Sequence, residues 1–536
     1  MKTPSRNFFL KVLHSLTKRE RLVLYSAVAI FSISALTYGG LLYKTKTYAV
    51  PTQGGTYREG VVGQPSFVNP IIPTTETDRA VSRLIFSSLE DMAESIKQSD
   101  DGKTWNVRLY DNIFWHDGEK LTADDIVFTV DVIHDPNSHS YLRGSFDGVN
   151  VSRVSELEIQ FSLQNAYAFF KEDHLRSLRP IPKHLFVDLP VTNYQLTPYG
   201  LSPVGSGPYK VASYEKDVGG FIKSFKLKAN EEYFTHPPYI TNFVFKFFRK
   251  DSELISSYNL GQIDGFGLST AEPLEERPII IRHSAHYLSS SRYYAIFINQ
   301  SLAPEKLKEL SVRRALSGAV GRNDLVDKVF AGHAIPFFGP TNIAGNSFTS
   351  YDPEVIKGLE LSLVVPDEPF LVKTADEIKV DWEALGAKVN LVVRSLRDIR
   401  EDVLRNTNYE MILFGNIVKE GNDLFAFWHS SKRFFPDQNL ALYQDGGTDS
   451  LLEEYRRTFD ATTRAHLLEQ ISSRISAEVP AVFLYSPDYV FITTPNLQGV
   501  DDTHIINTSD DRFADVTEWF VKSKRTFRKP IGVWGT

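Results

Sequence analysis

The feature that most limits how this chain can fold is an apolar run without a charged residue, from Leu22 to Tyr43. At helical rise, a run of this length crosses roughly 30 Å of hydrocarbon, which predicts a transmembrane helix over 22–43. The residues before it carry one acidic side chain, Glu20, and several basic ones: Lys2, Arg6, Lys11, Lys18, Arg19 and Arg21. Because basic flanks stay in the cytoplasm, we expect a cytoplasmic segment over 1–21, a single-pass anchor in the cell membrane and an extracytoplasmic body, either periplasmic or at the cell surface.

A cleaved signal peptide is the alternative interpretation of the same run. The run is longer than the usual apolar core of a signal peptide, and no clear small-x-small cleavage site follows it, so a retained anchor is favoured. The chain contains no cysteine, which excludes lipid attachment through a thiol, disulfides, metal–thiolate sites and cysteine nucleophiles. A short polar linker is expected over 44–53, between the membrane and the body.

The body is large enough for several cores. The whole chain has 536 residues, which predicts about three folding units. Its 42% hydrophobic and 23% charged residues are typical of globular domains. The net charge is −7 although the N-terminal segment is basic, so the body itself is acidic, which argues against a nucleic-acid partner.

Strand-like and helix-like segments alternate along the body, which indicates an α/β fold. One clear unit consists of a strand at Leu361–Val365, a helix at Val372–Leu385 that stops at Gly386, and a strand at Val389–Val393. This pattern predicts a βαβ crossover. A helix-rich stretch then runs from Thr448 to Ala477.

The segment from Asp101 to Thr129 is the most informative part of the body. After the turn signal at Asp101-Gly102, apolar and polar residues alternate from Trp105 to Tyr110, as in a half-buried strand. A polar turn around His116 follows, and Thr122 stands where a helix N-cap is expected. We interpret His116 as a hydrogen-bonded turn residue rather than as a catalyst or a metal ligand.

The same segment resembles the signature region of the family 5 extracellular solute-binding proteins, which deliver oligopeptides, dipeptides, nickel complexes and some sugars to ABC importers. Other motifs are similar to those of the family and occur in the same order: Gly54–Tyr57, Pro65–Pro70, Arg179–His184, Pro203–Tyr209, Leu260–Asp264, Arg292–Asn299 and Val312–Leu316. Each motif is weak alone, but together they cover most of the chain.

The resemblance implies a periplasmic-binding-protein-like α/β fold of type II, a three-lobed Venus flytrap behind the transmembrane helix. Lobe I would combine 54–80, 203–285 and 485–536, lobe II would be an insertion over 81–202, and lobe III would cover 286–484. Lobe III would close over lobe I around a small ligand, because interdomain crevices commonly hold ligands.

The family also suggests where lobe I would touch the ligand. The loop after its Asn-Pro motif supplies an edge that hydrogen-bonds an extended peptide. The matching positions here are Thr74, Thr75 and Glu76. The alternative is that these residues are solvated and cap the helix that follows.

Lobe III would contribute the strand Met411–Gly415 and the loop Asn416–Asp423. Peptide-binding members carry an aspartate in this loop for the ligand's ammonium, and here its place is not clearly filled. Glu420 or Asp423 would substitute, whereas Lys419 would favour an anionic ligand. Gly415 and Asn416 would line the site, and five aromatic residues would form either its apolar wall or ordinary core: Phe266, Tyr293, Tyr294, Phe425 and Trp428.

No constellation for catalysis stands out. His283 and His286 have no third metal ligand nearby, Ser206 lacks the strand–elbow–helix context of a hydrolase serine, and no phosphate-binding P-loop occurs. We therefore expect no catalytic residue, metal or cofactor. The resemblance implies a monomeric substrate-binding protein that passes a peptide or another small solute to ABC permease subunits. The alternative is a membrane-anchored sensor or interaction protein on the same scaffold.

Overall fold

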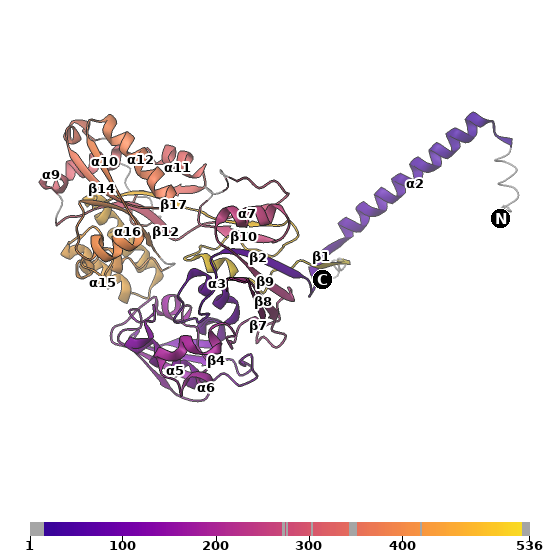
Figure 1. The fold of residues 1–536 in the computed structure, drawn as a ribbon, viewed down its shortest axis with the longest axis horizontal. Coiled ribbons are helices and arrows are strands. Elements are labelled where there is room, and N and C mark those ends of the chain that lie inside the picture. The colour runs from indigo at the N-terminus through magenta and orange to yellow at the C-terminus, as the bar shows by residue number, and fades with distance from the viewer. Residues whose placement is uncertain are drawn as a thin grey trace, which may run out of the picture. The chain divides into compact units, whose positions relative to one another are not determined.

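The computed structural model describes residues 15–270, 274, 277–301, 304–341, 351–418 and 421–527. The chain forms two compact units: Met1–Gln53 with Lys522–Thr536, and Gly54–Val521. Figure 1 shows their elements.

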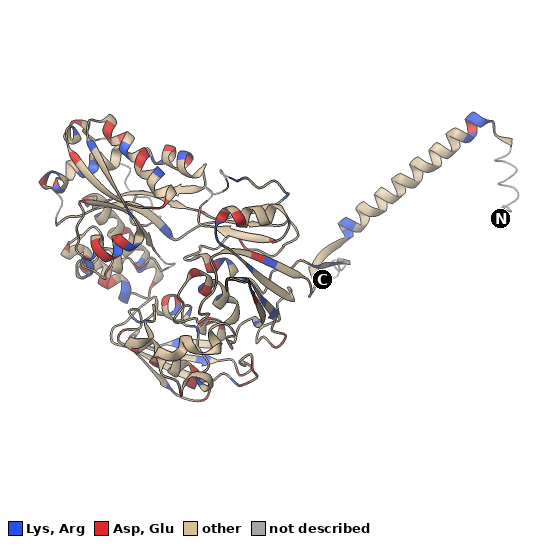
Figure 2. Cartoon of the chain, viewed as in Figure 1, with Lys and Arg blue, Asp and Glu red and all other residues tan. Residues whose placement is uncertain are grey.

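The first unit contains helix α2, Lys18–Lys46, in which no residue is buried. Thr17 caps the helix in a reciprocal pair with Glu20. The helix is long and apolar enough to cross a membrane, and Figure 2 shows charged residues only near its two ends. A linker was expected over 44–53. In the structure the helix continues to Lys46, and strand β1, Thr47–Pro51, follows it. This strand pairs antiparallel with β19, Ser523–Phe527.

The second unit contains a seven-stranded sheet in the order β11-β18-β10-β2-β9-β8-β7. Its strands are β2 Thr56–Val62, β7 Tyr209–Lys216, β8 Ile222–Ala229, β9 Asn242–Phe248, β10 Gly265–Leu268, β11 Ser284–Leu288 and β18 Tyr489–Thr493. The central strand β2 runs parallel to both β9 and β10, so their carboxyl ends share one edge. Helices α3, Glu76–Ile85, and α7, Asp251–Asn259, pack against this sheet.

A six-stranded sheet has the order β13-β17-β12-β16-β14-β15. Its strands are β12 Arg292–Ile298, β13 Ala334–Pro336, β14 Glu360–Pro366, β15 Lys388–Arg394, β16 Met411–Ile417 and β17 Ala481–Pro487. Successive residues of β12 enter two different cores, because side chains of a strand alternate between faces. Figure 1 shows α10–α12 over one face and α15 and α16 over the other.

The helices on this sheet are α10 Leu310–Ala319, α11 Arg322–Phe330, α12 Pro369–Ala384, α15 Gly446–Arg457 and α16 Ala461–Glu478. The predicted βαβ unit is confirmed as β14, α12 and β15, with the two strands parallel. The helix-rich stretch predicted over 448–477 is divided into α15 and α16, because the side chain of Asp460 accepts the backbone N–H of Thr463 and starts a new helix.

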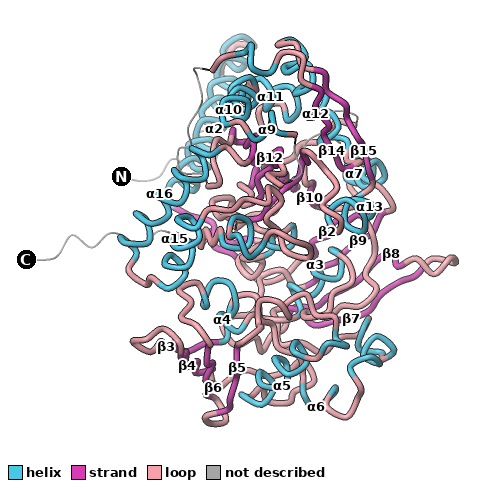
Figure 3. Tube along the Cα trace, turned by 90° about the vertical axis from the view of Figure 1, so that its left-hand side faces the viewer, coloured by secondary structure: helices cyan, strands magenta, loops and turns pink. Residues whose placement is uncertain are grey.

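A four-stranded antiparallel sheet completes the second unit in the order β3-β4-β6-β5, and Figure 3 shows it beside α5. Its elements are β3 Ala93–Gln98, β4 Thr104–Leu109, α5 Ala123–His134, β5 Val149–Arg153 and β6 Glu158–Leu163. The strand and capped helix predicted over 101–129 are confirmed as β4 and α5, with Thr122 and Asp125 in a capping box.

The remaining elements are short. The α-helical ones are α4 Leu89–Met92, α6 Lys183–Phe186, α9 Glu305–Lys308, α13 Leu396–Asp398 and α14 Phe425–Trp428. Short 3₁₀ or π helices occupy Pro136–Ser138, Lys171–Leu175, Val191–Leu196, Pro198–Gly200, Pro353–Ile356, Ile399–Leu404, Ser430–Lys432 and Ser509–Phe513.

His116 joins two of the sequence motifs, as expected for a turn residue. Its Nε2 lies 3.0 Å from the carbonyl oxygen of Gly207, and the N–H of Gly205 donates to its Nδ1 at 3.3 Å. Burial lowers the pKa of His116 to about 4, so the imidazole is neutral at pH 7. A side chain at Gly205 or Gly207 would collide with the backbone of Ile85, which explains both glycines.

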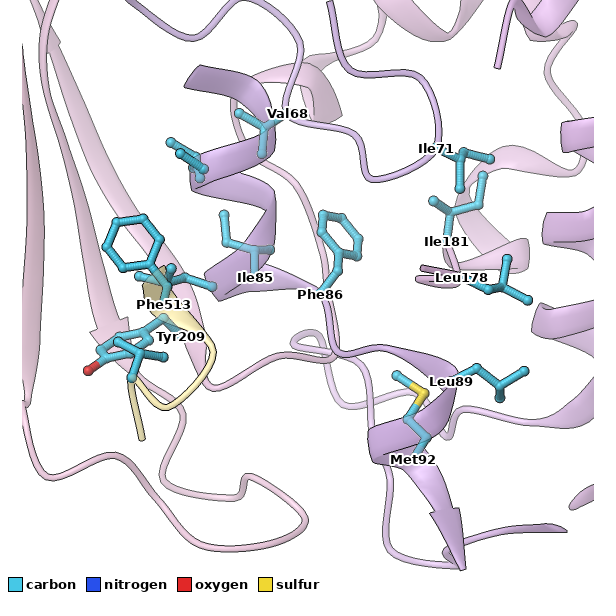
Figure 4. Close-up of a cluster of buried hydrophobic side chains, with 14 of the residues drawn as sticks. Val68, Ile71, Ile85, Phe86, Leu89, Met92, Leu178, Ile181, Tyr209 and Phe513 are labelled. Carbon is cyan, nitrogen blue, oxygen red and sulfur yellow. The ribbon is translucent and has the colours of Figure 1, made fainter. Parts of the chain in front are cut away.

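Ile85, whose backbone both glycines approach, is the last residue of α3 and belongs to the largest hydrophobic core. Figure 4 shows Ile85 and Phe86 there, followed by Leu89 and Met92. All four are buried in one hydrophobic cluster that also contains residues of the seven-stranded and four-stranded sheets. This shared core holds the end of α3 against both sheets.

Candidate functional site

A pocket of about 310 Å³ lies where β2 and β10 end, between the seven-stranded sheet and the start of α12. In open α/β sheets, ligands typically bind outside the carboxyl ends of the strands. We name it the sheet-edge pocket, and its lining is Gly60, Val61, Val62, Glu76, Thr77, Ala80, Asp251, Gly267, Leu268, Ser269, Thr270, Glu368, Pro369, Phe370, Tyr489, Ser509 and Arg512.

Three helices begin at this pocket. Glu76 is the first residue of α3, Asp251 the first of α7, and Glu368 the N-cap of α12. Free N–H groups and the helix dipole favour negative charge at a helix N-terminus, whereas the three carboxylates favour a cation. Burial raises the pKa of Asp251. The pocket therefore presents both kinds of group that a zwitterionic ligand needs.

A buried ion pair holds Arg512, one of the residues that line the sheet-edge pocket. Arg512 Nη2 lies 2.8 Å from Glu59 Oε1, and the two side chains are 4% and 0% exposed. Tyr57 donates its hydroxyl to Glu59 Oε2 at 2.8 Å. Burial raises the pKa of Glu59, while Arg512 opposes this shift. Because the Glu59 carboxylate pairs with Arg512, the guanidinium is held in one position in the lining of the pocket.

The predicted lobe I residues lie at the start of α3. Glu76 lines the pocket, whereas Thr75 is the N-cap of α3 and accepts the N–H of Asp78 at 3.0 Å. Thr74 donates its hydroxyl to Asp78 Oδ2 at 2.7 Å. The alternative helix-capping role is therefore present for Thr75, and a ligand contact of Thr74 or Thr75 stays a prediction.

Replacing Thr75 by alanine is expected to lower the free energy of unfolding by about 1 kcal/mol, because the N–H of Asp78 loses its acceptor. Thr75→Ser keeps the hydroxyl and should match the parent. Urea unfolding of both variants measures the effect. An unchanged free energy of unfolding in Thr75→Ala would contradict the capping role.

The predicted lobe III residues on β12 and β16 form two neighbouring pairs. Tyr294 lies opposite Gly415, and a side chain at Gly415 would come within 2.7 Å of its ring. Tyr294 also packs at 5.3 Å on the ring of Phe370, a wall of the sheet-edge pocket. On the other face, Asn416 donates to the hydroxyl of Tyr293 at 3.3 Å. Tyr294 and Gly415 thus support the pocket wall from behind.

Asp423 lies apart from these residues, in a contact between the loop after β16 and the loop after β6. Its carboxylate accepts the hydroxyl of Tyr167 at 3.0 Å and lies 3.1 Å from Arg456 Nε. Burial raises the pKa of Asp423, and Arg456 opposes the shift. The guanidinium of Arg456 also stacks over Phe425 at 4.4 Å. Asp423, one of the two residues that could pair with the ligand's ammonium group, is therefore already paired with Arg456.

A second pocket of about 380 Å³ lies next to this contact. Among the predicted residues, Phe425 lines it, together with residues of β5, β6 and α15. Phe266 and Trp428 are both fully buried, Phe266 against Tyr258 and Trp428 against Phe297, and line neither pocket. Lys419 and Glu420 lie outside the described residues.

The sequence interpretation did not identify several residues that line or close these pockets. Glu368 and Phe370 come within four residues of the end of β14, so the rule that ligands bind at the carboxyl ends of strands would have found them. Asp251 follows β9 in the same way. Tyr167 and Arg456 carry no local signal, because only the fold brings them to Asp423.

Comparisons with known proteins match most of the chain. The family described as bacterial extracellular solute-binding proteins, family 5 Middle, matches residues 89–434. The oligopeptide-binding protein AppA of Bacillus subtilis (strain 168) is 25% identical over 520 residues, covering 85% of this chain and 90% of that protein. The nickel-binding periplasmic protein of Escherichia coli (strain K12) is 24% identical over 453 residues, covering 76% and 83%.

Solved structures show the same fold. The ABC transporter substrate binding protein CtaP from Listeria monocytogenes has a TM-score of 0.75 at 21% identity, covering 88% of this chain and 100% of that chain. AppA from Bacillus subtilis in complex with a nonapeptide has a TM-score of 0.69 at 21% identity, with the same coverage. The fold is therefore the α/β periplasmic-binding-protein fold, as expected from the sequence motifs.

Proposed function

The chain belongs to family 5 of the bacterial extracellular solute-binding proteins, and we propose that it captures a short peptide, or a solute of similar size, in the sheet-edge pocket. It is a non-enzymatic substrate-binding protein of an ABC importer, as the family assignment predicted. The observation that carries the proposal is the position of the pocket, at the carboxyl ends of β2 and β10 and against the start of α12.

A peptide with free ends fits the charges around this pocket. The N-termini of α7 and α12, which have no side-chain cap, suit a carboxylate, while Glu76, Asp251 and Glu368 suit an ammonium group. Relatives named as oligopeptide-binding and dipeptide-binding proteins support the same ligand class. Asp423 would be available to an ammonium group only if Arg456 moved away from it.

The proposed capture involves hinge closure of the three lobes expected above: 54–80 with 203–285 and 485–536, the insertion 81–202, and 286–484. The pocket draws its walls from the first of these lobes and, through Glu368–Phe370, from the third. A ligand that touches both walls binds the closed form better and shifts the population toward it. The closed monomer then docks on the permease subunits.

We also propose that α2 is retained as a single-pass anchor with its N-terminus in the cytoplasm. Six basic residues precede the apolar run, against Lys44 and Lys46 directly after it, which supports this orientation, and the chain has no cysteine for lipid attachment. In addition, β1 follows the helix directly and pairs with β19, so removal of the helix would have to leave β1 intact to preserve that pairing.

The ligand proposal is tested with the full chain purified in detergent. Mass spectrometry of molecules released on denaturation identifies a bound ligand, and thermal shift then compares peptide pools. At a concentration of 100 Kd, a ligand stabilises the folded state by about 2.7 kcal/mol. Peptides with free termini should raise Tm more than the same peptides after N-acetylation or C-amidation.

A nickel complex or a sugar serves as the comparison ligand in the same assay. If one of these raises Tm and no peptide pool does, the peptide assignment is wrong while the family assignment stands. Equal shifts for free and blocked peptides would contradict the role of the helix N-termini and carboxylates.

A further inference from the structure

The end of the membrane helix α2 leads directly into a two-stranded ribbon. Strand β1 begins at Thr47, the residue after α2, and pairs along its whole length with β19. The register places Thr47 opposite Phe527 and Tyr48 opposite Thr526. The last described residues of the chain therefore lie at the end of the helix.

Arg525 fastens this ribbon to the helix. Its Nε donates to Thr47 Oγ1 at 2.8 Å, and its Nη2 donates to the carbonyl oxygen of Lys44 at 3.1 Å. Lys44 is in the last turn of α2, where carbonyl groups have no partner within the helix. The rings of Tyr43 and Phe527 meet edge to face at 6.0 Å. The C-terminal strand thus caps the helix as well as pairing with β1.

The surface of this junction is aromatic and basic. Tyr43, Tyr48 and Phe527 are 47%, 48% and 66% exposed. No acidic residue occurs in 44–53 or in 522–527, although the body is acidic overall. Such a surface differs from the rest of the body, and it starts at the last turn of an apolar helix.

We propose that the junction is a collar that binds the anionic headgroup layer of the membrane, through Tyr43, Lys44, Lys46, Tyr48, Lys524 and Phe527. Aromatic rings are favoured at the boundary between hydrocarbon and water, and basic side chains near a membrane are attracted to anionic lipids. Covalent continuity with α2 places the collar at this boundary. The inference rests on the proposed retention of α2 as an anchor.

The collar changes how the body is attached. A helix followed by a flexible linker would hold the body by one strand, whereas the ribbon returns the C-terminal end of the body to the membrane as well. Five paired residues per strand span about 16 Å at strand rise, so the ribbon is a short two-stranded extension of the helix end. Attraction between anionic lipids and the lysines of the collar would then stabilise the pairing of β1 with β19.

The test uses the full chain reconstituted in vesicles of phosphatidylcholine, with or without 30% phosphatidylglycerol. Because the chain has no cysteine, Thr526→Cys gives a single site for an environment-sensitive fluorophore. Quenching by lipids that carry a spin label near the headgroup should be stronger in the anionic vesicles, because only their headgroups attract the lysines of the collar. A label at Ser450→Cys, an exposed position on α15, should show no such difference.

Charge reversal provides the matched variants. Lys46→Glu with Lys524→Glu should abolish the difference between the two vesicles, while Lys46→Arg with Lys524→Arg should keep it. Reversal of two exposed lysines of the body, Lys97→Glu with Lys223→Glu, should leave it unchanged. The Tm of each variant checks that the body remains folded.

Two results distinguish a failure of the collar proposal from a failure of the anchor proposal on which it rests. If the protein stays in the membrane during alkaline carbonate extraction but the label at 526 is equally quenched, or equally unquenched, in both vesicles, the collar is wrong and the anchor stands. If carbonate releases the protein, the anchor is wrong and the collar fails with it. Neither result affects the assignment of solute binding.

Discussion

Replacing Arg512 by methionine is expected to lower the free energy of unfolding by about 3–5 kcal/mol, because Glu59 then remains buried without a cation. Glu59 is 0% exposed, and Arg512 Nη2 lies 2.8 Å from its carboxylate. Arg512 also packs at 4.1 Å over the ring of Phe513, a contact that methionine only partly replaces. Urea unfolding followed by tryptophan fluorescence measures the loss.

The double variant Glu59→Gln with Arg512→Met is the control. Glutamine removes the charge and still accepts the hydroxyl hydrogen bond that Tyr57 donates to this position at 2.8 Å. If the loss in Arg512→Met comes from an unpaired charge, the double variant should recover most of it. A double variant as unstable as the single one would show that packing, and not charge, is the cause.

The pH dependence of the Arg512→Met variant gives a second readout. Burial raises the pKa of Glu59, and Arg512 is the main opposing influence, so its removal raises this pKa further. A folded-state pKa above the unfolded value of about 4.3 means that the folded state binds the extra proton. The deficit relative to the parent should therefore be largest near pH 7 and shrink as the pH falls toward 5. A deficit that does not change with pH would contradict the role of Glu59.

Local patterns were sufficient to predict much of the fold. The alternation from Trp105 to Tyr110 identified β4, and the Thr122 cap identified the start of α5. The unit of β14, α12 and β15 followed from two apolar strands and a helix that stops at Gly386. The signals that identify these elements, the alternation of a strand and the cap or stop of a helix, lie in neighbouring residues, which is why they are visible in the sequence.

The candidate site was harder to predict, because strand neighbours point to opposite faces. Tyr293 and Tyr294 were expected either at the ligand or in ordinary core; Tyr294 packs on Phe370 at the sheet-edge pocket, whereas Tyr293 stacks on Phe337 in the other core, and a ligand contact of either stays a prediction. The partner of Asp423 could not be predicted from the sequence either. Arg456 comes from α15, and no local pattern relates it to the loop after β16.

The sheet-edge pocket and the second pocket are alternative positions for the ligand. A tryptophan placed in the lining of each pocket distinguishes the two positions. Ser269 is exposed in the lining of the sheet-edge pocket, and Asn165 is exposed in the lining of the second pocket. Both positions lie outside helices and strands, so the larger side chain displaces pocket space rather than core residues. Neither substitution should change the free energy of unfolding by more than about 0.5 kcal/mol.

Ser269→Trp is expected to weaken ligand binding at least about 100-fold, equivalent to about 2.7 kcal/mol, because the indole occupies space that the ligand needs. Asn165→Trp should weaken it less than about threefold, and Ser269→Ala should match the parent. Isothermal titration calorimetry with the ligand identified from the purified protein provides the three affinities. If Asn165→Trp blocks binding and Ser269→Trp does not, the ligand occupies the pocket beside Arg456, and closure must then act between the four-stranded sheet and α15 rather than at the edge where β2 and β10 end.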